Sequence, residues 1–316
     1  MKKDNIIPIM LCHDNNYVIP SAVAIHSLLE KANRDIFYKI YVLHSDVTQR
    51  NQKKLYKEVT KFNNASIKFI NIGNRFDNLF SKTRAKAHYS KEMYYKLIAC
   101  SIFPQYDKLV ITDVDVVFLG DISKSYTEFD EKDDVYLAGV KMLNKMDFFL
   151  KNYEKNFSKK EQWLINQGIG AGYLILNLNK IRECELETNF LDFLKNNTNR
   201  LVQPEQDILN LCSDGKIKFL HLKYMTCSYM YDKYHLDDLQ DEENFSFKFN
   251  FSKKELKEAY ENPIQLHYAT HIKPWNDRSC TKSEIWFKYL IKTNFKIDFI
   301  IKKLKSILFF KGDNYI

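Results

Sequence analysis

The feature of this sequence that most restricts its fold is an alternation of short apolar runs with amphipathic helical segments. Residues 6–12 form an apolar run suited to a buried strand, and residues 18–33 follow with apolar side chains at helical spacing. The pattern then repeats as strand, helix and strand over residues 38–45, 48–62 and 66–72. Alternation of this kind predicts an α/β fold with a mostly parallel sheet and helices on both faces.

Similar segments continue through the rest of the chain. Helices are predicted over residues 90–103, 179–197 and 204–215, and strands over residues 170–178 and 216–222. No internal repeat and no low-complexity linker separates them. We therefore expect a single domain over residues 1–280, followed by a tail of basic, amphipathic character over residues 281–316.

Two aspartates interrupt one of the apolar runs. In VITDVDVVFLGD, residues 110–121, Asp113 and Asp115 lie at the end of a predicted strand, and an extended backbone points both side chains to one side. An ionised Asp costs several kcal/mol to desolvate unless it is paired or binds a cation. Ligands of open α/β sheets bind beyond the carboxyl ends of the strands, which is where these two residues belong.

On the residues alone, three interpretations of this pair remain open. Paired carboxylates suit a divalent cation that bridges the phosphates of a nucleotide. The same letters resemble the nucleophile motif of haloacid dehalogenase-like phosphatases, in which Asp113 would be phosphorylated. That interpretation needs a later apolar strand that ends in an acidic cluster, and none follows residue 121. The third interpretation is a pair of solvated loop carboxylates without a ligand.

Composition and cysteine usage exclude several classes of protein. The chain has 316 residues, of which 45% are hydrophobic, so it is long and apolar enough for a packed core. Its formal charge of +8 is spread along the chain, and its six cysteines form neither a CxxC pair nor a dense disulfide framework. The first apolar run is too short for a signal sequence, and no run reaches the roughly 20 residues of a membrane span. We expect a cytoplasmic protein.

Five motifs follow one another along the chain. They are IPIMLCHDNNYVIPSAVAIHSLL, KEMYYKLIACSIFPQYDKLVITDVDVVFLGDIS, GAGYLILNLNKIRE, PEQDILN and LHYATHIKPWN. In this order they resemble glycosyltransferase family 8, the retaining galactosyltransferase and glycogenin-like enzymes, including the lipopolysaccharide glycosyltransferase type. The resemblance implies a GT-A fold over residues 1–280, a Rossmann-like sheet that binds a UDP-sugar and a manganese or magnesium ion.

The resemblance also implies roles for individual residues. The metal ion would be held by Asp113, Asp115 and His267. His271 in the same motif is a second candidate histidine. Lys273 would bind the diphosphate and Gln206 would lie beside the anomeric carbon, so these two are the candidate catalytic residues. Besides the metal ligands and Lys273, the residues that would contact the donor are Cys12, Asp14, Asn16, Lys96, Val114, Gly170, Ala171, Glu205 and Thr270.

Four positions depart from the pattern of the family. Lys96 replaces the usual Arg and cannot present a planar bidentate fork. Gly170 replaces an Asn, Met142 stands where an acidic residue often touches the donor sugar, and Thr270 replaces a glycine. Because the changes surround the expected sugar pocket, we expect that pocket to be less polar and roomier. It would then admit a donor such as a UDP-N-acetylhexosamine.

Together these inferences predict a retaining, manganese-dependent enzyme that transfers a hexose from a UDP-sugar to a glycan acceptor. The acceptor expected is a bacterial surface oligosaccharide, and no nucleic-acid partner is expected. The alternatives are a phosphatase that uses Asp113 as nucleophile and a non-catalytic binding protein with the same fold.

The end of the chain has a character of its own. In NFKIDFIIKKLKSILFFKG, residues 294–312, six apolar residues share one helical face: Ile297, Ile300, Ile301, Leu304, Ile307 and Leu308. Phe309, Phe310 and Lys311 extend this helix, and the other lysines lie away from the apolar face. We expect the tail to contact an anionic membrane peripherally, at its inner face. The alternatives are a helix docked on the catalytic domain or paired with a second subunit.

Overall fold

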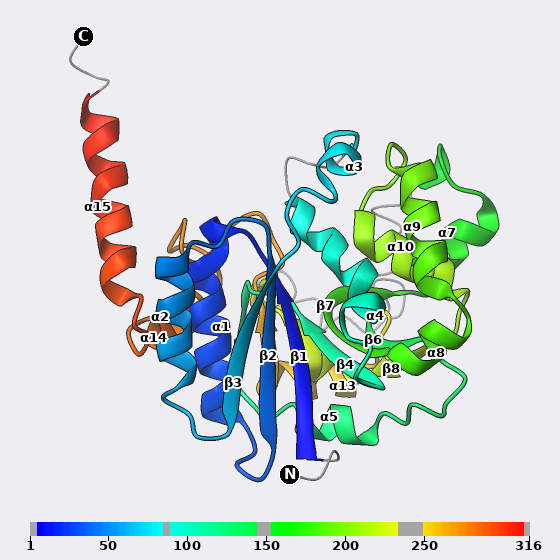
Figure 1. Ribbon diagram of the computed structural model, residues 1–316, viewed down its shortest axis with the longest axis horizontal. Helices are drawn as coiled ribbons and strands as arrows, with labels where there is room; N and C mark the ends of the chain where they lie inside the picture. The colour runs from blue at the N-terminus through cyan, green and yellow to red at the C-terminus, as the bar shows by residue number, and fades with distance from the viewer. Residues whose placement is uncertain (1–4, 85–88, 144–152, 233–248, 313–316) are drawn as a thin grey trace.

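The computed structural model describes residues 5–84, 89–143, 153–232 and 249–312, and of residues 306–312 it describes the backbone alone. A seven-stranded sheet in the order β3-β2-β1-β4-β7-β6-β8 forms its centre (Figure 1). All its strands run parallel except β7, which pairs antiparallel with both neighbours. The predicted α/β class with a mostly parallel sheet is confirmed. The strands are β1 Ile6–Cys12, β2 Phe37–His44, β3 Ala65–Asn71, β4 Lys108–Thr112, β6 Leu137–Lys141, β7 Ile169–Asn177 and β8 Ile217–Leu220.

Helices cover both faces of this sheet, as the sequence predicts (Figure 1). One face packs against α1 Val18–Lys31 and α2 Gln49–Val59. The opposite face packs against η3 Lys91–Ile98, α4 Ala99–Ile102, α8 Leu178–Glu183, α9 Leu186–Asn197 and α10 Pro204–Ser213. The shorter elements around them are η2 Asn15–Tyr17, α3 Asp77–Ser81, α5 Ser123–Glu128, α7 Lys159–Asn166, η5 Leu222–Met225, η6 Ser228–Tyr231 and α13 Lys253–Glu261. Among the described residues, an apolar core therefore forms on each side of the sheet, and a third cluster lies under α14 Ser283–Leu290.

A second, three-stranded sheet brings distant parts of the chain to the end of β4. It consists of β5 Val116–Phe118, β10 Gln265–His267 and β9 Thr226–Cys227. β10 runs antiparallel to β5, with His267 opposite Val116, and the backbone N–H of Tyr268 donates to the carbonyl of Asp115 over 2.9 Å. This pairing fixes His267 beside the two aspartates.

Three of the predicted elements differ in detail. Residues 91–98 form a 3₁₀ helix, and α-helix begins only at Ala99. The side chains of residues 92–98 are all buried, so tertiary contacts decide this tighter geometry. The helix predicted over residues 179–197 is broken at Glu185, whose φ of 50° lies in the left-handed region. The predicted strand through Asp113 and Asp115 ends at Thr112, and the chain resumes in the small sheet at Val116.

The segment before the last helix is packed against the body of the protein. α14 Ser283–Leu290 lies on α1, and Trp286 and Phe295 are fully buried. Burial of each such side chain contributes roughly 1.5–3 kcal/mol. The division of the chain at residue 280 stays a prediction, and these contacts place residues 283–295 with the catalytic body. α15 Lys296–Gly312 then projects away from it (Figure 1).

One buried carboxylate fastens this segment. Glu58 on α2 is fully buried and accepts hydrogen bonds from His26 Nδ1 (2.6 Å), Lys61 Nζ (2.9 Å) and the backbone N–H of Asn294 (2.7 Å). Burial opposes ionisation of Glu58, but these donors outweigh it and hold the pKa of the carboxyl below its usual value. The start of α15 is therefore fixed relative to α1 and α2. Among the described residues, no helix combines the length and apolar character that crossing a membrane requires.

Candidate active site

The two aspartates and His267 converge at the carboxyl end of β4. Asp113 follows β4 directly, and its backbone N–H donates to the carbonyl of Gly172 on β7 over 3.2 Å. His267 Nε2 lies 3.2 Å from Asp115 Oδ1 and 3.7 Å from Asp113 Oδ2. Ligand atoms of all three residues lie within 4.8 Å of one another. The sequence-predicted triad is thus brought together.

Two lysines complete the charged cluster. Lys96, at 3% exposure, donates to Asp113 Oδ1 (2.7 Å), to the carbonyl of Ala171 (3.0 Å) and to Glu205 Oε1 (3.2 Å), so its three protons are all used. Lys273 Nζ lies 2.5 Å from Asp115 Oδ2 and 2.6 Å from the carbonyl of Tyr268. Each aspartate therefore has its own ammonium partner.

The electrostatics of the cluster keep Asp115 ionised. Burial raises the pKa of Asp115, but Lys273 and His267 outweigh burial and hold that pKa well below its usual range. Burial likewise opposes the charge of Lys96, but Asp113 and Glu205 raise the pKa of its ammonium above the ordinary value. Three carboxyl groups, those of Asp113, Asp115 and Glu205, thus meet the two ammonium groups of Lys96 and Lys273 here.

The ligand atoms of these three residues suit a divalent cation. Two carboxylate oxygens and one imidazole nitrogen are ligands that Mn²⁺ accepts, and Mg²⁺ prefers the oxygens. The side chain of Asp113 is 30% exposed, which leaves the cluster open on one side. His271, the second candidate, is exposed and does not join this group.

Gln206 lies next to the cluster at the start of α10. Its Oε1 accepts the backbone N–H of Ala171 over 3.0 Å, and its Nε2 donates to Gln203 Oε1 and to Met142 Sδ. The following residue, Asp207, is fully buried and accepts from Tyr153 Oη (2.8 Å) and two backbone N–H groups. Burial raises the pKa of Asp207 to about 7, although these donors oppose it. Asp207 thereby holds the turn that carries Gln206.

The residues predicted near the nucleotide lie at the end of β1. Burial raises the pKa of the Cys12 thiol. The carboxylate of Asp14 accepts from the backbone N–H of Asn16 (2.9 Å) and Tyr17 (3.2 Å) and from the Asn16 side chain (3.0 Å). Asp14 therefore caps the turn that begins α1, in addition to the nucleotide contact predicted for it.

Two other residues predicted to contact the donor, Val114 and Thr270, have partners within the protein. The side chain of Val114 is 6% exposed and packs into the core on the α1 side of the sheet. The Thr270 hydroxyl donates to the carbonyl of Ile272 over 3.0 Å. Both side chains therefore have structural partners of their own.

Sequence reasoning missed three residues at this site. The ring of Tyr17 meets that of Trp275 edge-on, with centroids 5.7 Å apart, beside Lys273. Gly172 lies against His267: a Cβ at this position would come within 2.6 Å of the imidazole. Met225 lies in the buried core beside the same strand. Tyr17 follows the DNN turn directly and offered a signal, whereas nothing in the sequence around Met225 points to the site.

The expectation of a roomier sugar pocket stays a prediction, but the space beside Gly170 itself is filled. A Cβ on Gly170 would lie 2.5 Å from Met225 Cε and 3.1 Å from its Sδ. The space that the missing side chain leaves is therefore filled by a thioether. Two methionines therefore lie in this part of the site: Met225 beside Gly170, and Met142 beside Gln206.

Sequence comparison matches this chain to a known family. The sequence profile described as glycosyl transferase family 8 matches residues 8–279. The lipopolysaccharide 1,2-glucosyltransferase of Escherichia coli (strain K12) is 25% identical over 300 residues, which cover 94% of this chain and 81% of that protein.

Two solved structures share the fold. One is galactosyltransferase LgtC in complex with donor and acceptor sugar analogs, with a TM-score of 0.66 and 16% identity over 91% of this chain and 96% of that one. The other is the WbbM bifunctional glycosyltransferase, with a TM-score of 0.70 and 19% identity over 95% of this chain. This chain spans about half, 52%, of the latter. The predicted GT-A fold is confirmed.

The phosphatase interpretation of Asp113 is thereby set aside, because the matching profile spans most of the chain and is that of a sugar-transferring family. This protein belongs to glycosyl transferase family 8.

Proposed function

We propose that this enzyme transfers a hexose from a UDP-sugar to a glycan acceptor, with retention of configuration and with Mn²⁺ as the metal ion. The observation that carries the proposal is the convergence of Asp113, Asp115 and His267, with ligand atoms within 4.8 Å of one another, next to Lys273. A cation at these ligands would offset the charge that develops on the departing UDP.

The reaction breaks the bond between the sugar C1 and the β-phosphate oxygen, and that oxygen keeps the electron pair. An acceptor hydroxyl oxygen forms a new bond to C1 on the same face, and its proton leaves with UDP. Lys273 lies beside Asp115, one of the proposed metal ligands. Its ammonium is therefore placed where the diphosphate of a metal-bound UDP-sugar would lie. Gln206 has a positioning role beside C1, because its amide is held by Ala171 and Gln203.

A bacterial surface oligosaccharide is the acceptor that we propose. The similarity to a protein named lipopolysaccharide 1,2-glucosyltransferase supports this class of acceptor. The rings of Tyr17 and Trp275 offer apolar faces for the uracil base of the donor.

The test is release of UDP from UDP-glucose, UDP-galactose and their N-acetylated counterparts, with and without Mn²⁺. We expect Mn²⁺-dependent release from at least one donor and loss of release on chelation. Failure of every donor, together with no binding of UDP in the presence of Mn²⁺, would contradict the proposal.

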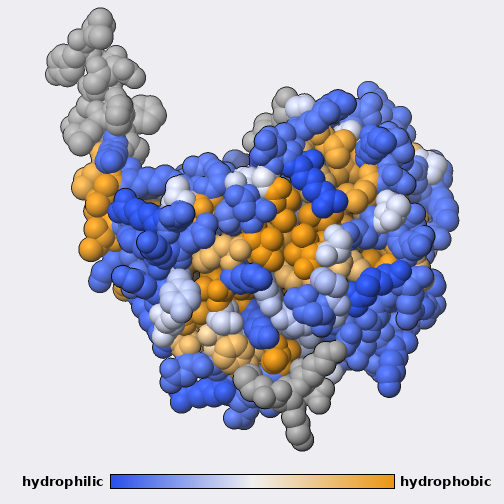
Figure 2. Space-filling view, viewed as in Figure 1, coloured by the Kyte–Doolittle hydropathy of each residue, from blue (hydrophilic) through white to orange (hydrophobic). Residues whose placement is uncertain are grey.

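We also propose that α15 contacts the inner face of an anionic membrane. Four of its apolar side chains are between 46% and 60% exposed: Ile297, Ile300, Ile301 and Leu304 (Figure 2). The lysines of α15 add positive charge, and each Lys near an anionic surface contributes roughly 1 kcal/mol. The residues predicted to extend this face, from Ile307 on, have side chains outside the described part of the chain.

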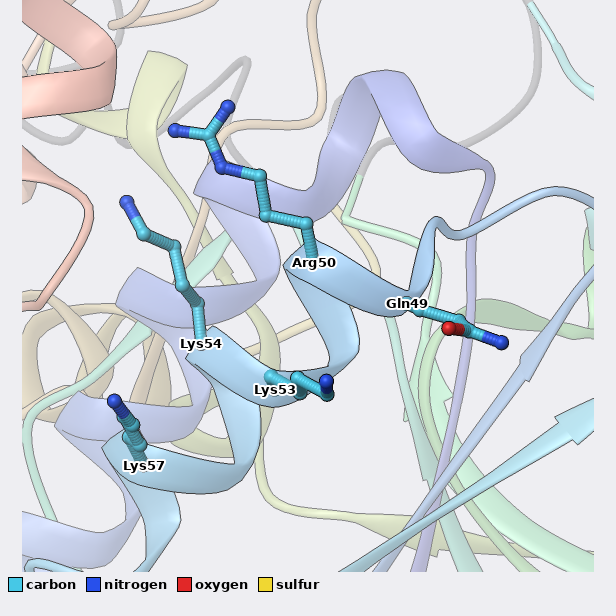
Figure 3. A pocket seen from close by; sticks show the side chains of 5 residues that line it. All are labelled: Gln49, Arg50, Lys53, Lys54 and Lys57. Carbon is cyan, nitrogen blue, oxygen red and sulfur yellow. The ribbon is translucent and has the colours of Figure 1, made fainter.

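A cationic hollow on α2 extends this surface. It is lined by Gln49, Arg50, Lys53, Lys54 and Lys57 (Figure 3). Arg50 and Lys54 form ion pairs with Asp298 on α15, which joins the two helices. The hollow offers cations and no catalytic group, so we assign it to anionic headgroups.

Co-sedimentation with vesicles tests this proposal. The full chain is expected to bind vesicles that contain anionic lipid, and to do so less at high salt. A chain ending at Phe295 keeps the packed segment 283–295 and the hollow on α2 but lacks the apolar face of α15, so it should bind these vesicles more weakly than the full chain. Equal binding by both chains, or none by either, would sink the membrane proposal.

A further inference from the structure

Met225 occupies a central place in the site although the known motifs assign it no role. Its Sδ lies 3.1 Å from the Cβ position of Gly170 and 3.2 Å from that of Gly172. These two glycines lie two residues apart on β7, so their Cβ positions point to the same side of the strand. The thioether therefore lies across both glycines, and it can do so only because neither has a side chain.

Met225 lies close to two residues to which the proposed function assigns roles at the donor. The Cβ position of Gly170 is 3.7 Å from Gln206 Oε1, and that of Gly172 is 2.6 Å from the ring of His267. Met225 thus stands between the residue proposed to lie beside C1 and the proposed metal ligand. Its side chain is 6% exposed and packs in the core on the α1 side of the sheet, so its position is fixed.

A second methionine borders the same amide. Gln206 Nε2 donates to Met142 Sδ over 3.4 Å, and Met142 is half-buried. The backbone carbonyl of Met142 is itself held by Asn250 Nδ2 over 2.9 Å. Two thioethers therefore flank Gln206.

A surface formed by the side chains of Met225 and Met142 favours contact with a methyl group over contact with a hydroxyl group. A thioether is a weak acceptor and has no donor. The amide of Gln206 is already engaged, because its Oε1 accepts from the backbone N–H of Ala171 and its Nε2 donates to Gln203. A sugar hydroxyl against this surface would lose hydrogen bonds to water without replacement, which is unfavourable. A methyl group would instead gain contact with polarizable sulfur and its neighbouring carbons.

We propose that Met225 determines donor specificity, and that the donor is a UDP-sugar with an N-acetyl group whose methyl packs against Met225 and Met142. This inference rests on the proposed function, because it concerns the sugar of that same reaction. Gly170 and Met225 act as a pair, since a side chain at position 170 would displace the thioether.

Calorimetric binding to the full chain with Mn²⁺ tests the inference. The ligands are UDP, UDP-N-acetylglucosamine, UDP-N-acetylgalactosamine, UDP-glucose and UDP-galactose. The wild type should bind one N-acetylated donor at least about tenfold more tightly than the matching hexose donor. Met225→Gln has a similar length but a polar end, and it should lose this preference while it still binds UDP.

Two further variants keep the test sharp. Met225→Leu remains apolar and should keep the preference, which separates polarity from a general disturbance of the fold. Met230→Gln places the same amide in the same core, where Met230 is 3% exposed, and should leave the preference in place.

The outcomes separate the two proposals. If the wild type binds UDP but does not prefer an N-acetylated donor, or if Met225→Gln retains the preference, the inference about Met225 is overturned and the proposed function stands. If the wild type binds no UDP with Mn²⁺, the proposed function fails first.

Discussion

The double substitution Asp113→Asn, Asp115→Asn is expected to lower Mn²⁺-dependent release of UDP at least about a thousandfold. The two amides keep the shape of the carboxylates but remove both negative charges from the proposed metal ligands, and a bound cation stabilises the transition state by several kcal/mol. The measurement is the rate of UDP release from the donor that the wild type cleaves fastest, at saturating Mn²⁺.

The control for this variant is Asp133→Asn, which removes a charge from an exposed ion pair with Lys218. The segment that carries Asp133 contacts Lys108 at the start of β4, the opposite end of that strand from Asp113. An exposed pair contributes roughly 0–1 kcal/mol, so activity should remain near that of the wild type. Circular dichroism should show that both variants are folded. Near-normal turnover by the double variant would mean that these aspartates do not hold the metal ion.

The substitution Gly172→Ala is expected to weaken Mn²⁺ binding about 10–100-fold, although it changes no ligand. The new methyl carbon would lie 2.6 Å from His267 Cε1 and Nδ1, closer than real Cβ contacts allow, so the imidazole must move. Displacement of a group that orients a metal ligand typically costs this much affinity. The measurement is the Mn²⁺ dissociation constant by electron paramagnetic resonance.

A second glycine provides a matched control. A Cβ on Gly139, on the adjacent strand β6, would lie 2.6 Å from Ile169 Cδ1, so Gly139→Ala introduces a clash of the same size away from the cluster. Both variants should be destabilised by roughly 1–3 kcal/mol. Only Gly172→Ala should change Mn²⁺ affinity; an equal loss in both would show that the effect is a general disturbance of the sheet.

The sequence predicts well those parts of the fold that depend on local periodicity. Six elements lie within a few residues of their predicted bounds: the strands β1, β2 and β3 and the helices α1, α2 and α10. The family resemblance groups Asp113, Asp115 and His267, and the structure brings them together. Both kinds of signal are read from short stretches of sequence: periodicity from neighbouring residues, and the resemblance from individual motifs.

What the sequence could not predict depends on contacts between distant segments. The orientation of β7 follows from its pairing with β4 and β6, and its apolar run is the same in either direction. The filling of Gly170 by Met225 joins two residues whose proximity no periodicity records. The burial of Trp286 and Phe295 depends likewise on contacts with distant segments, which the composition of the tail does not record.

The third proposed ligand comes from the small sheet of β5, β9 and β10, which is completed only late in protein synthesis. Asp113 and Asp115 leave the ribosome early, but His267 lies on β10, far beyond the last strand of the central sheet. A nascent chain, or a product of premature termination, that ends before residue 267 therefore carries two of the three proposed ligands, however much of its sheet has formed. The full set of proposed ligands is therefore present only in chains that include nearly all of the residues that form the two sheets.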